Sequence, residues 1–247
     1  MKLAEVHRWI QTKIDKTLNY YKEFGLWKTI LRFCESLGIF KKRVFIFFEL
    51  DLKDFIFGKK NNHHIDLVRV GKEDLEKVGK YLYEWFEKDE ALKSLEAGNV
   101  LFTVKDGEKM IYYEWTEFKK IDLPYLDLSF FIPDDTAHNG YNYTEPEYRR
   151  KGIASKAKLL TLKYQRENGI QRAFCIIPPN NTESLRLNKK VGFKEYQTVF
   201  YWRLLFLKYY CVKDYHTGSQ KVFWGSGKAT QELWKTFSKI GPETDHD

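Results

Sequence analysis

The spacing of apolar residues along the amino-terminal part of the chain is that of an amphipathic helix, with steps of three and four residues. This stripe covers residues 3–37, where Gly25 interrupts it, and Gly38 follows it as a C-terminal cap would. Its members are Leu3, Val6, Ile10, Ile14, Leu18, Tyr21, Trp27, Ile30, Leu31, Cys34 and Leu37. A continuous apolar run over residues 44–50 then predicts one strand. We therefore expect an amino-terminal extension, helical with one strand, over residues 1–62.

From residue 65 the pattern changes to short apolar runs separated by turn residues and by amphipathic segments. Strands are predicted over residues 65–70, 100–104, 109–118, 125–132, 137–144, 173–177, 193–203 and 204–212, and helices over residues 72–97, 152–168 and 181–192. This order of elements indicates a mixed α/β sheet and not the regular alternation of a doubly wound fold. We expect a core domain over residues 63–212. Residues 213–247 should add a strand and a helix that pack on this core.

The composition is that of a folded protein with an excess of positive charge. Of the 247 residues, 43% are hydrophobic and 31% are charged, and the formal net charge is +8. Residues 1–60 contribute most of this excess, because they hold 13 Lys or Arg against 7 Asp or Glu. A basic amphipathic segment is typical of contact with a membrane surface, or of packing either on its own domain or on a twin subunit in a homodimer. All three readings stay open for residues 3–50, whereas no zinc-finger spacing or long basic run indicates a nucleic-acid partner.

Cysteine usage and the length of the apolar runs bear on the compartment. Cys34, Cys175 and Cys211 are odd in number and far apart, so they predict neither a disulfide framework nor a metal site. The first residues carry charges instead of an apolar signal core, and no apolar run is long enough to span a bilayer. We expect a cytoplasmic protein without a metal, with association at a membrane as the alternative.

The stretch from residue 148 to residue 160 places a basic, glycine-containing turn directly before a helix. Arg149, Arg150 and Lys151 precede Gly152, and Ala154 lies in the first helical turn. The first N–H groups of a helix have no intrahelical partner and carry partial positive charge, so small residues there leave room for an anion. The arrangement is that of a phosphate cradle. Read alone, it is equally that of an ordinary turn with solvated cations.

The short helix predicted over residues 181–192 carries clear capping signals. Asn181 is a strong N-cap, Ser184 occupies the third helical position, and Gly192 is the C-cap. Alone, this pattern indicates no more than a well-capped helix. Other phosphate-binding patterns are excluded, because the chain has neither a Gly-x-x-x-x-Gly-Lys-Ser/Thr sequence nor a Gly-x-Gly-x-x-Gly sequence after a strand.

Together the two stretches resemble the coenzyme A site of GNAT superfamily N-acetyltransferases. The family shows Arg/Gln-x-x-Gly-x-Gly/Ala at the start of its central helix and, after a further strand, Asn-x-x-Ala/Ser and a closing Gly-Phe. The matching residues are Arg149, Gly152, Ala154, Asn181, Ser184, Gly192 and Phe193. The resemblance covers residues 65–212. It implies a mostly antiparallel central sheet, flanked by helices and splayed between the strands before and after the central helix.

The resemblance also implies acetyl-CoA as the co-substrate and assigns residues to it. The backbone from Arg150 to Ala154 would hold the pyrophosphate, and residues 142–144 would pair with the pantetheine arm as a further strand. The implied coenzyme A ligands are Asn142, Tyr143, Thr144, Arg149, Arg150, Lys151, Gly152, Ile153, Ala154, Asn181, Ser184 and Lys190. A neutral amine would then attack the thioester carbonyl directly, with a backbone N–H polarising its oxygen.

The residues that should move protons depart from the family pattern. Many members place a tyrosine, the acid for the leaving thiolate, where this chain has Asn188, so Tyr196 or solvent would have to replace it. His138 is the candidate base, because it lies on the strand before the cradle. Further candidates, for the acceptor site, are Glu114, Asp127 and Tyr141. For His138 and for these three, an ordinary position on a surface strand or loop is the competing reading.

The sequence thus predicts an acetyl-CoA-dependent N-acetyltransferase that acts on a primary amine of a small or medium acceptor, either a small molecule or an amino sugar. Two alternatives share the fold. In the first, the domain binds an acyl-CoA without turnover and serves as a sensor or scaffold, which the departure at Asn188 favours. In the second, the enzyme uses a longer acyl donor, which the aromatic-rich strands favour.

Overall fold

The computed structural model describes residues 39–57, 65–75 and 88–227, together with Ala229 and scattered positions between residues 11 and 32. Three predicted segments lie largely outside these residues: the amphipathic stripe, the middle of the helix expected over residues 72–97, and the carboxyl-terminal helix. Predictions that rest on them, including a membrane contact or a homodimer through residues 3–50, stay predictions.

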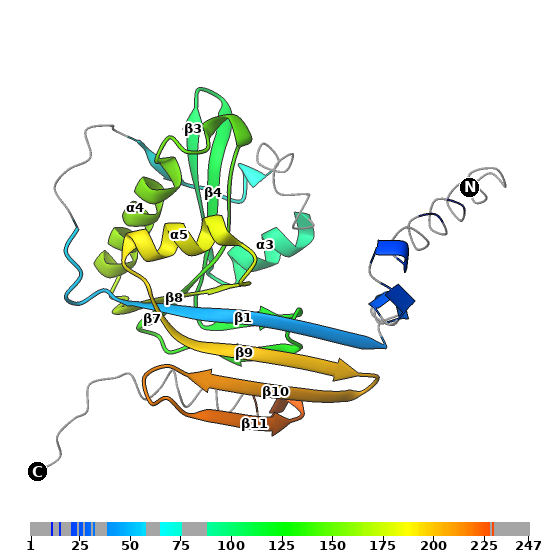
Figure 1. Cartoon of the computed structure of the whole chain (residues 1–247). Coiled ribbons are helices and arrows are strands. Elements are labelled where there is room, and N and C mark those ends of the chain that lie inside the picture. The colour runs from blue at the N-terminus through cyan, green and yellow to red at the C-terminus, as the bar shows by residue number, and fades with distance from the viewer. Residues whose placement is uncertain are drawn as a thin grey trace, which may run out of the picture.

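Nine of the described strands form one sheet, and two more form a separate hairpin (Figure 1). In spatial order the sheet runs β11-β10-β9-β1-β8-β7-β4-β3-β2, and the hairpin joins β5 to β6. The strands are β1 (Phe40–Asp51), β2 (Leu67–Arg69), β3 (Val100–Asp106), β4 (Lys109–Glu117), β5 (Lys120–Leu123), β6 (Leu128–Phe131), β7 (Thr136–Thr144), β8 (Arg172–Ile177), β9 (Lys194–Leu204), β10 (Leu207–Asp214) and β11 (Gln220–Trp224). The helices are α3 (Lys88–Glu96), α4 (Ile153–Glu167) and α5 (Thr182–Val191), with a 3-10 turn at Pro146–Tyr148. The predicted mixed α/β class is confirmed.

One pair of neighbouring strands in this sheet is parallel, and it separates along its length. β7 and β8 pair only where Thr136, Ala137 and His138 lie opposite Arg172, Ala173 and Phe174. Beyond these residues β7 stays paired with β4, whereas β8 stays paired with β1. The sheet therefore opens between β7 and β8, as the resemblance implies, and leaves an edge of β7 from Asn139 onwards that β8 does not cover.

β1 lies in the middle of the sheet, although the sequence places it in an extension that ends at residue 62. It pairs antiparallel with β8 on one side and with β9 on the other. Its neighbouring residues Phe47 and Phe48 are both fully buried, in two different core clusters. A continuous apolar run is typical of such an interior strand, because both of its faces are covered. Residues 40–51 are therefore part of the core sheet.

The helices α4 and α5 and the β5–β6 hairpin cover opposite faces of this sheet. The neighbouring helices α4 and α5 pack on one face, where Leu162 and Val191 share a core cluster with Phe48 of β1 (Figure 1). The β5–β6 hairpin packs on the other face, where Leu128 shares a cluster with Phe47. Because successive residues of a strand point to opposite faces, each interior strand contributes to both cores.

Candidate active site

A cavity of about 510 Å³ opens at the place where β7 and β8 separate. Its walls are formed by Phe45 of β1, Tyr113 of β4, His138, Gly140, Tyr141, Asn142 and Tyr143 of β7, Ile176 and Ile177 of β8, Asn181 and Ser184 at the start of α5, and the loop residues Tyr125 and Pro178. We call it the splay cavity. Its size and its mixture of aromatic walls with a few polar groups are typical of a small-molecule site.

The β7 wall of the splay cavity contains a β-bulge. The pairing with β4 shifts register between Glu114 and Thr116, so that β7 holds one more residue than its partner around Gly140 and Tyr141. A bulge takes one residue out of the regular ladder and redirects its backbone groups. This is the part of β7 whose other edge β8 leaves open, so the bulge can present a backbone N–H to a bound molecule.

His138 and Glu117 form a pair at the base of the splay cavity. The β4–β7 register places the two residues directly opposite each other, and His138 Nδ1 lies 2.6 Å from Glu117 Oε2. The His138 side chain is 6% exposed, and the centroid of its ring lies 4.8 Å from that of the Phe174 ring. A carboxylate on Nδ1 fixes the tautomer that leaves Nε2 free to accept a proton. This is the arrangement expected of a general base.

Gly140 makes the close approach of this pair feasible. A Cβ atom at position 140 would lie 3.2 Å from Glu117 Oε2 and 3.6 Å from a ring carbon of His138. A Cβ atom there would make ordinary contact with the imidazole and would require the Glu117 carboxylate to shift by a few tenths of an ångström. The glycine also keeps the bulge open towards the cavity.

Two tyrosines of the splay cavity keep their protons throughout the physiological range. Burial raises the pKa of Tyr141, and the negative charges of Glu117 and Glu90 add to the effect. Burial likewise raises the pKa of Tyr125, whose ring packs 4.3 Å from Phe45. Tyr141, a predicted acceptor-site residue, therefore lines the cavity as a neutral hydroxyl. It can donate or accept a hydrogen bond but brings no charge.

The predicted phosphate cradle adjoins the splay cavity. α4 begins after Gly152, whose φ is +80° and whose position offers no side-chain cap, and its first turn carries no acid. Arg150 also has a left-handed φ of +63°, so the turn folds back on itself before the helix starts. Successive left-handed and right-handed residues point their N–H groups into one concavity, which favours anions.

Arg149 connects this cradle to the cavity wall. Its Nε donates to the Thr144 carbonyl at 2.9 Å, and its guanidinium lies 5.4 Å from the centre of the Tyr143 ring. Lys151 lies 4.9 Å from the centre of the Tyr148 ring. The cations are thus fixed along the path from the helix start to the open edge of β7. An extended molecule with an anionic group at one end would fit this path.

The second motif reaches the opposite wall of the splay cavity. Asn181 caps α5 by accepting a hydrogen bond from the Ser184 N–H at 3.1 Å, and both residues line the cavity. Asn188 is buried, donates from Nδ2 to the Ser184 carbonyl at 2.9 Å, and does not line the cavity. Lys190 is exposed in the last turn of α5 and does not line it either.

Three other predicted site residues do not line the splay cavity, and we do not assign them to it. Glu114 is fully buried on the α4 side of β4, where it pairs with Lys158 and accepts a hydrogen bond from Tyr112 Oη at 2.9 Å. Asp127, in the β5–β6 hairpin, accepts from Tyr201 Oη at 2.5 Å. Tyr196 is fully buried in the core against Phe47, and burial raises its pKa well above the usual range. Its hydroxyl is therefore in the core and does not line the cavity.

The sequence analysis missed Glu117, the partner of His138, and seven residues that line the splay cavity. The seven are Phe45, Tyr113, Tyr125, Gly140, Ile176, Ile177 and Pro178. Glu117 becomes visible only when the register between β4 and β7 is known, and Phe45 only when β1 is placed beside β8. Neither fact is local in the sequence.

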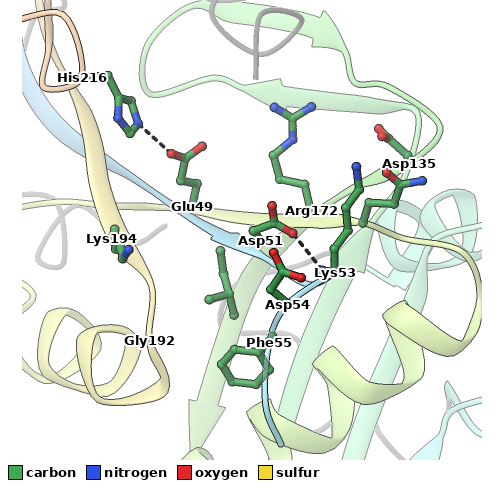
Figure 2. A pocket seen from close by; sticks show the side chains of 12 residues that line it. Glu49, Asp51, Lys53, Asp54, Phe55, Asp135, Arg172, Gly192, Lys194 and His216 are labelled. Carbon is green, nitrogen blue, oxygen red and sulfur yellow. Dashed lines mark hydrogen bonds and ion pairs between the residues drawn. The ribbon is translucent and has the colours of Figure 1, made fainter. Parts of the chain in front are cut away.

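A second cavity, of about 480 Å³, lies at the opposite end of β1 (Figure 2). Charged side chains of both signs line it, and Figure 2 shows the hydrogen bond of 2.7 Å between His216 and Glu49. Gly192, the C-cap of α5, is the one motif residue that lines this cavity, and none of the predicted coenzyme A ligands or proton-transfer candidates lines it. The splay cavity, which six of the predicted site residues line, is therefore the candidate active site.

Two surveys cover the described part of the chain. Within it, no helix is long and apolar enough to cross a membrane. No group of three or more His, Cys, Asp or Glu in the same residues is arranged to hold a metal ion. Cys175 and Cys211 are free thiols, and both are buried.

Comparison with known proteins places this site in a family. Residues 74–194 match the family model described as an acetyltransferase (GNAT) domain. A separate comparison, with curated proteins, finds no match to the sequence. An X-ray structure of a Drosophila protein is similar in fold, with a TM-score of 0.50 and 14% identity over 74% of this chain and 58% of that one.

Two further solved structures are similar. A putative GNAT acetyltransferase from Novosphingobium aromaticivorans is 14% identical, with a TM-score of 0.47 over 66% of this chain and 65% of that one. The aminoglycoside N-acetyltransferase AAC(6')-Iy, solved with CoA, is 19% identical, with a TM-score of 0.43 over 55% of this chain and 91% of that one. The chain spans less than two thirds of the Drosophila and Novosphingobium proteins. Residues 74–194, which contain both motifs and the β7–β8 splay, form an acetyltransferase domain of the GNAT family.

Proposed function

We propose that the chain is an acetyl-CoA-dependent N-acetyltransferase that acetylates a primary amine of a small or medium acceptor. The observation that carries this proposal is the meeting of three features at one cavity. These are the anion cradle at the start of α4, the open edge of β7, and the His138–Glu117 pair. A cavity of about 510 Å³ suits a small-molecule or amino-sugar acceptor better than a folded protein. We place the reaction in the cytoplasm.

The residues present fit acetyl-CoA as the co-substrate. The uncapped N–H groups that follow Gly152, with Arg149 and Lys151 beside them, would hold the pyrophosphate. The edge of β7 from Asn142 to Thr144 would pair with the pantetheine amides, opposite Asn181 and Ser184. When bound, the co-substrate supplies an activated thioester carbonyl.

His138 is proposed to take a proton from the acceptor amine, which must be neutral to attack. Glu117 holds the imidazole in the tautomer that this step needs and stabilises the imidazolium that results. A backbone N–H of the bulge at Gly140 and Tyr141 would stabilise the oxyanion as it forms. Asn188 does not reach the cavity, so solvent is proposed to protonate the leaving thiolate.

Titration calorimetry with CoA and acetyl-CoA tests the binding part of the proposal. Gly152→Glu places a carboxylate in the cradle and should weaken binding about 100-fold through like-charge repulsion. Gly169→Glu is the matched control. Gly169 follows the other end of α4, has a nearly identical φ of +85° against +80°, and also has no atom within 4 Å of a new Cβ. An absence of CoA binding by the unmodified protein would overturn the proposal.

A non-catalytic acyl-CoA sensor is the second candidate, because Asn188 replaces the usual acid and turns into its own helix. Thiol release from acetyl-CoA across a panel of primary amines separates the two. Turnover with any amine contradicts the sensor, and binding without turnover supports it. Comparing the affinities of the protein for acetyl-CoA and for a long-chain acyl-CoA tests the alternative in which the enzyme uses a longer acyl donor.

A further inference from the structure

The turn between β9 and β10 exposes four successive apolar side chains. Leu204, Leu205, Phe206 and Leu207 are 53%, 58%, 82% and 50% exposed. Leu204 pairs with Leu207, so Leu205 and Phe206 are the two residues of a tight hairpin turn. We call these four residues the apolar tip. Contiguous exposed apolar groups mark interaction sites more often than scattered ones do.

The backbone conformation of the apolar tip does not favour the residues that are found there. Leu205 has a left-handed φ of +53°. Two-residue hairpin turns that need a left-handed residue only at the first position normally have glycine there. Turns that need it at both positions normally have Asn-Gly or Asp-Gly. A leucine there costs backbone energy that a glycine would not. An uncommon backbone state that persists calls for a functional reason, and here the feature gained is an exposed apolar side chain.

A row of aromatic residues lies directly behind the tip. Tyr209 packs between Trp202 and Trp224, with ring centroids 5.2 Å and 5.1 Å apart. Trp202 and Tyr209 lie opposite each other, two residues behind Leu204 and Leu207, which is roughly 7 Å along the strands. Trp224 is 64% exposed. Trp and Tyr prefer the boundary where apolar lipid meets polar headgroups, because their rings are apolar with one polar end.

Basic residues surround this end of the sheet. Figure 1 shows the β9–β10 turn beside the start of β1, away from α4 and α5. Residues 39–43 and 203–208 hold five Lys or Arg and no acid. Asp127 of the β5–β6 hairpin contacts Lys41, Arg203 and Lys208, so one carboxylate faces three cations. The surface around the tip therefore favours an anionic partner.

We propose that the apolar tip inserts into the surface of an anionic phospholipid membrane. The tip would enter the acyl region, and the aromatic row and the Lys and Arg side chains would lie at headgroup depth. Interfacial anchors bury their apolar side by about 5–10 Å, which matches the distance between tip and aromatic row. A second copy of the chain is disfavoured, because four side chains offer a few hundred Å² and a stable interface needs roughly 800 Å² per partner.

Flotation with phosphatidylcholine vesicles, with and without 30% phosphatidylserine, tests this proposal. We expect the full chain to float with the anionic vesicles and to bind at least about tenfold more weakly to the neutral ones. Phe206→Glu should reduce binding to anionic vesicles at least about tenfold. It removes an aromatic ring that the membrane would bury, and it adds a charge of the same sign as the lipid headgroups. Leu205→Gly should weaken binding while relieving the turn.

Phe131→Glu is the matched control, since Phe131 is 67% exposed on β6, outside the tip. It should bind vesicles as the unmodified chain does, and CoA affinity should be equal in all variants. Failure of the unmodified chain to float with anionic vesicles overturns the proposal. Equal loss in Phe131→Glu overturns it too. The proposal is also overturned if the unmodified chain is a dimer that does not bind vesicles and Phe206→Glu is a monomer. The tip would then be a contact between two copies of the chain.

Discussion

Two glutamates of β4 lie three residues apart, and each faces a cationic or basic partner. Glu114 pairs with Lys158 of α4, and both side chains are completely shielded from solvent. Glu117 pairs with His138, at the base of a cavity that a small molecule can enter. An odd separation along a strand places the two carboxylates on opposite faces of the sheet. A glutamate paired with a basic side chain is therefore buried in the core on one face and lies beside the candidate active site on the other. We call Glu114–Lys158 the closed pair and Glu117–His138 the open pair.

The surroundings of the closed pair are dry. Burial raises the pKa of Tyr112 well above its usual range, and the charge and hydrogen bond of Glu114 add to this. Burial also raises the pKa of the Cys175 thiol to about 12, against the lowering influence of Lys158. Both groups stay neutral at physiological pH. A charge left alone in such surroundings is costly. The Glu117 side chain, at 20% exposure, is less completely shielded from solvent than that of Glu114.

The largest effect should follow from breaking the closed pair. Lys158→Met leaves the carboxylate of Glu114 buried without its cation, which should cost about 3–5 kcal/mol of unfolding free energy. Urea titration at pH 7 measures this change. The double variant Lys158→Met/Glu114→Gln should regain most of the loss, because the amide is neutral and still accepts from Tyr112 Oη. A loss below about 1 kcal/mol for the single variant would contradict the closed character of the pair.

The next effect should follow from breaking the open pair. If His138 is the base, His138→Gln should lower kcat about 100-fold, which is about 2.7 kcal/mol of barrier. Unfolding free energy should change far less than in Lys158→Met, and CoA affinity should not change. Steady-state kinetics, with urea titration beside them, measure both effects.

Glu117→Gln is the companion of that variant. It keeps a hydrogen-bond acceptor beside Nδ1 but removes the charge, so we expect a decrease of about tenfold in kcat. Rates within twofold of the unmodified enzyme for both variants would remove the pair from the mechanism.

The smallest effect should come from Asp127, a partly exposed carboxylate that belongs to neither pair. Burial disfavours the charged form of Asp127, but the Tyr201 hydroxyl, Lys208 and Lys41 outweigh it and hold the pKa below its usual value. A carboxylate with a lowered folded-state pKa stabilises the fold above its unfolded pKa of about 4, and this contribution is lost as the pH falls through the folded-state pKa.

Asp127→Asn should therefore cost about 1 kcal/mol at pH 7 and progressively less below pH 4, where the unmodified chain loses the same interaction. Denaturant titrations of both proteins at several pH values measure the difference. A difference that is constant with pH would mean that the charge of Asp127 contributes nothing.

The sequence predicts well what is set by neighbouring residues. The start of α4 at Gly152, the cap at Asn181 and the class of the fold follow from local spacing, because caps and amphipathic periods are formed within a few residues. Partners across strands are not predictable in this way. Glu114 was expected at the acceptor site, yet which face of β4 it occupies depends on register and on helix packing. The sequence predicts His138 as a candidate base, which stays a prediction, but it does not indicate Glu117 as the partner of His138.

The position of β1 has a consequence for the order in which the chain can be built. Phe40 pairs with Leu204 and Ile46 with Ile177, so an interior strand made early must wait for strands that leave the ribosome more than 100 residues later. Contacts of such long sequence separation slow folding and leave apolar strands uncovered meanwhile. A version of the protein that starts at residue 63 would carry the whole family domain and still lack the strand that joins its two halves.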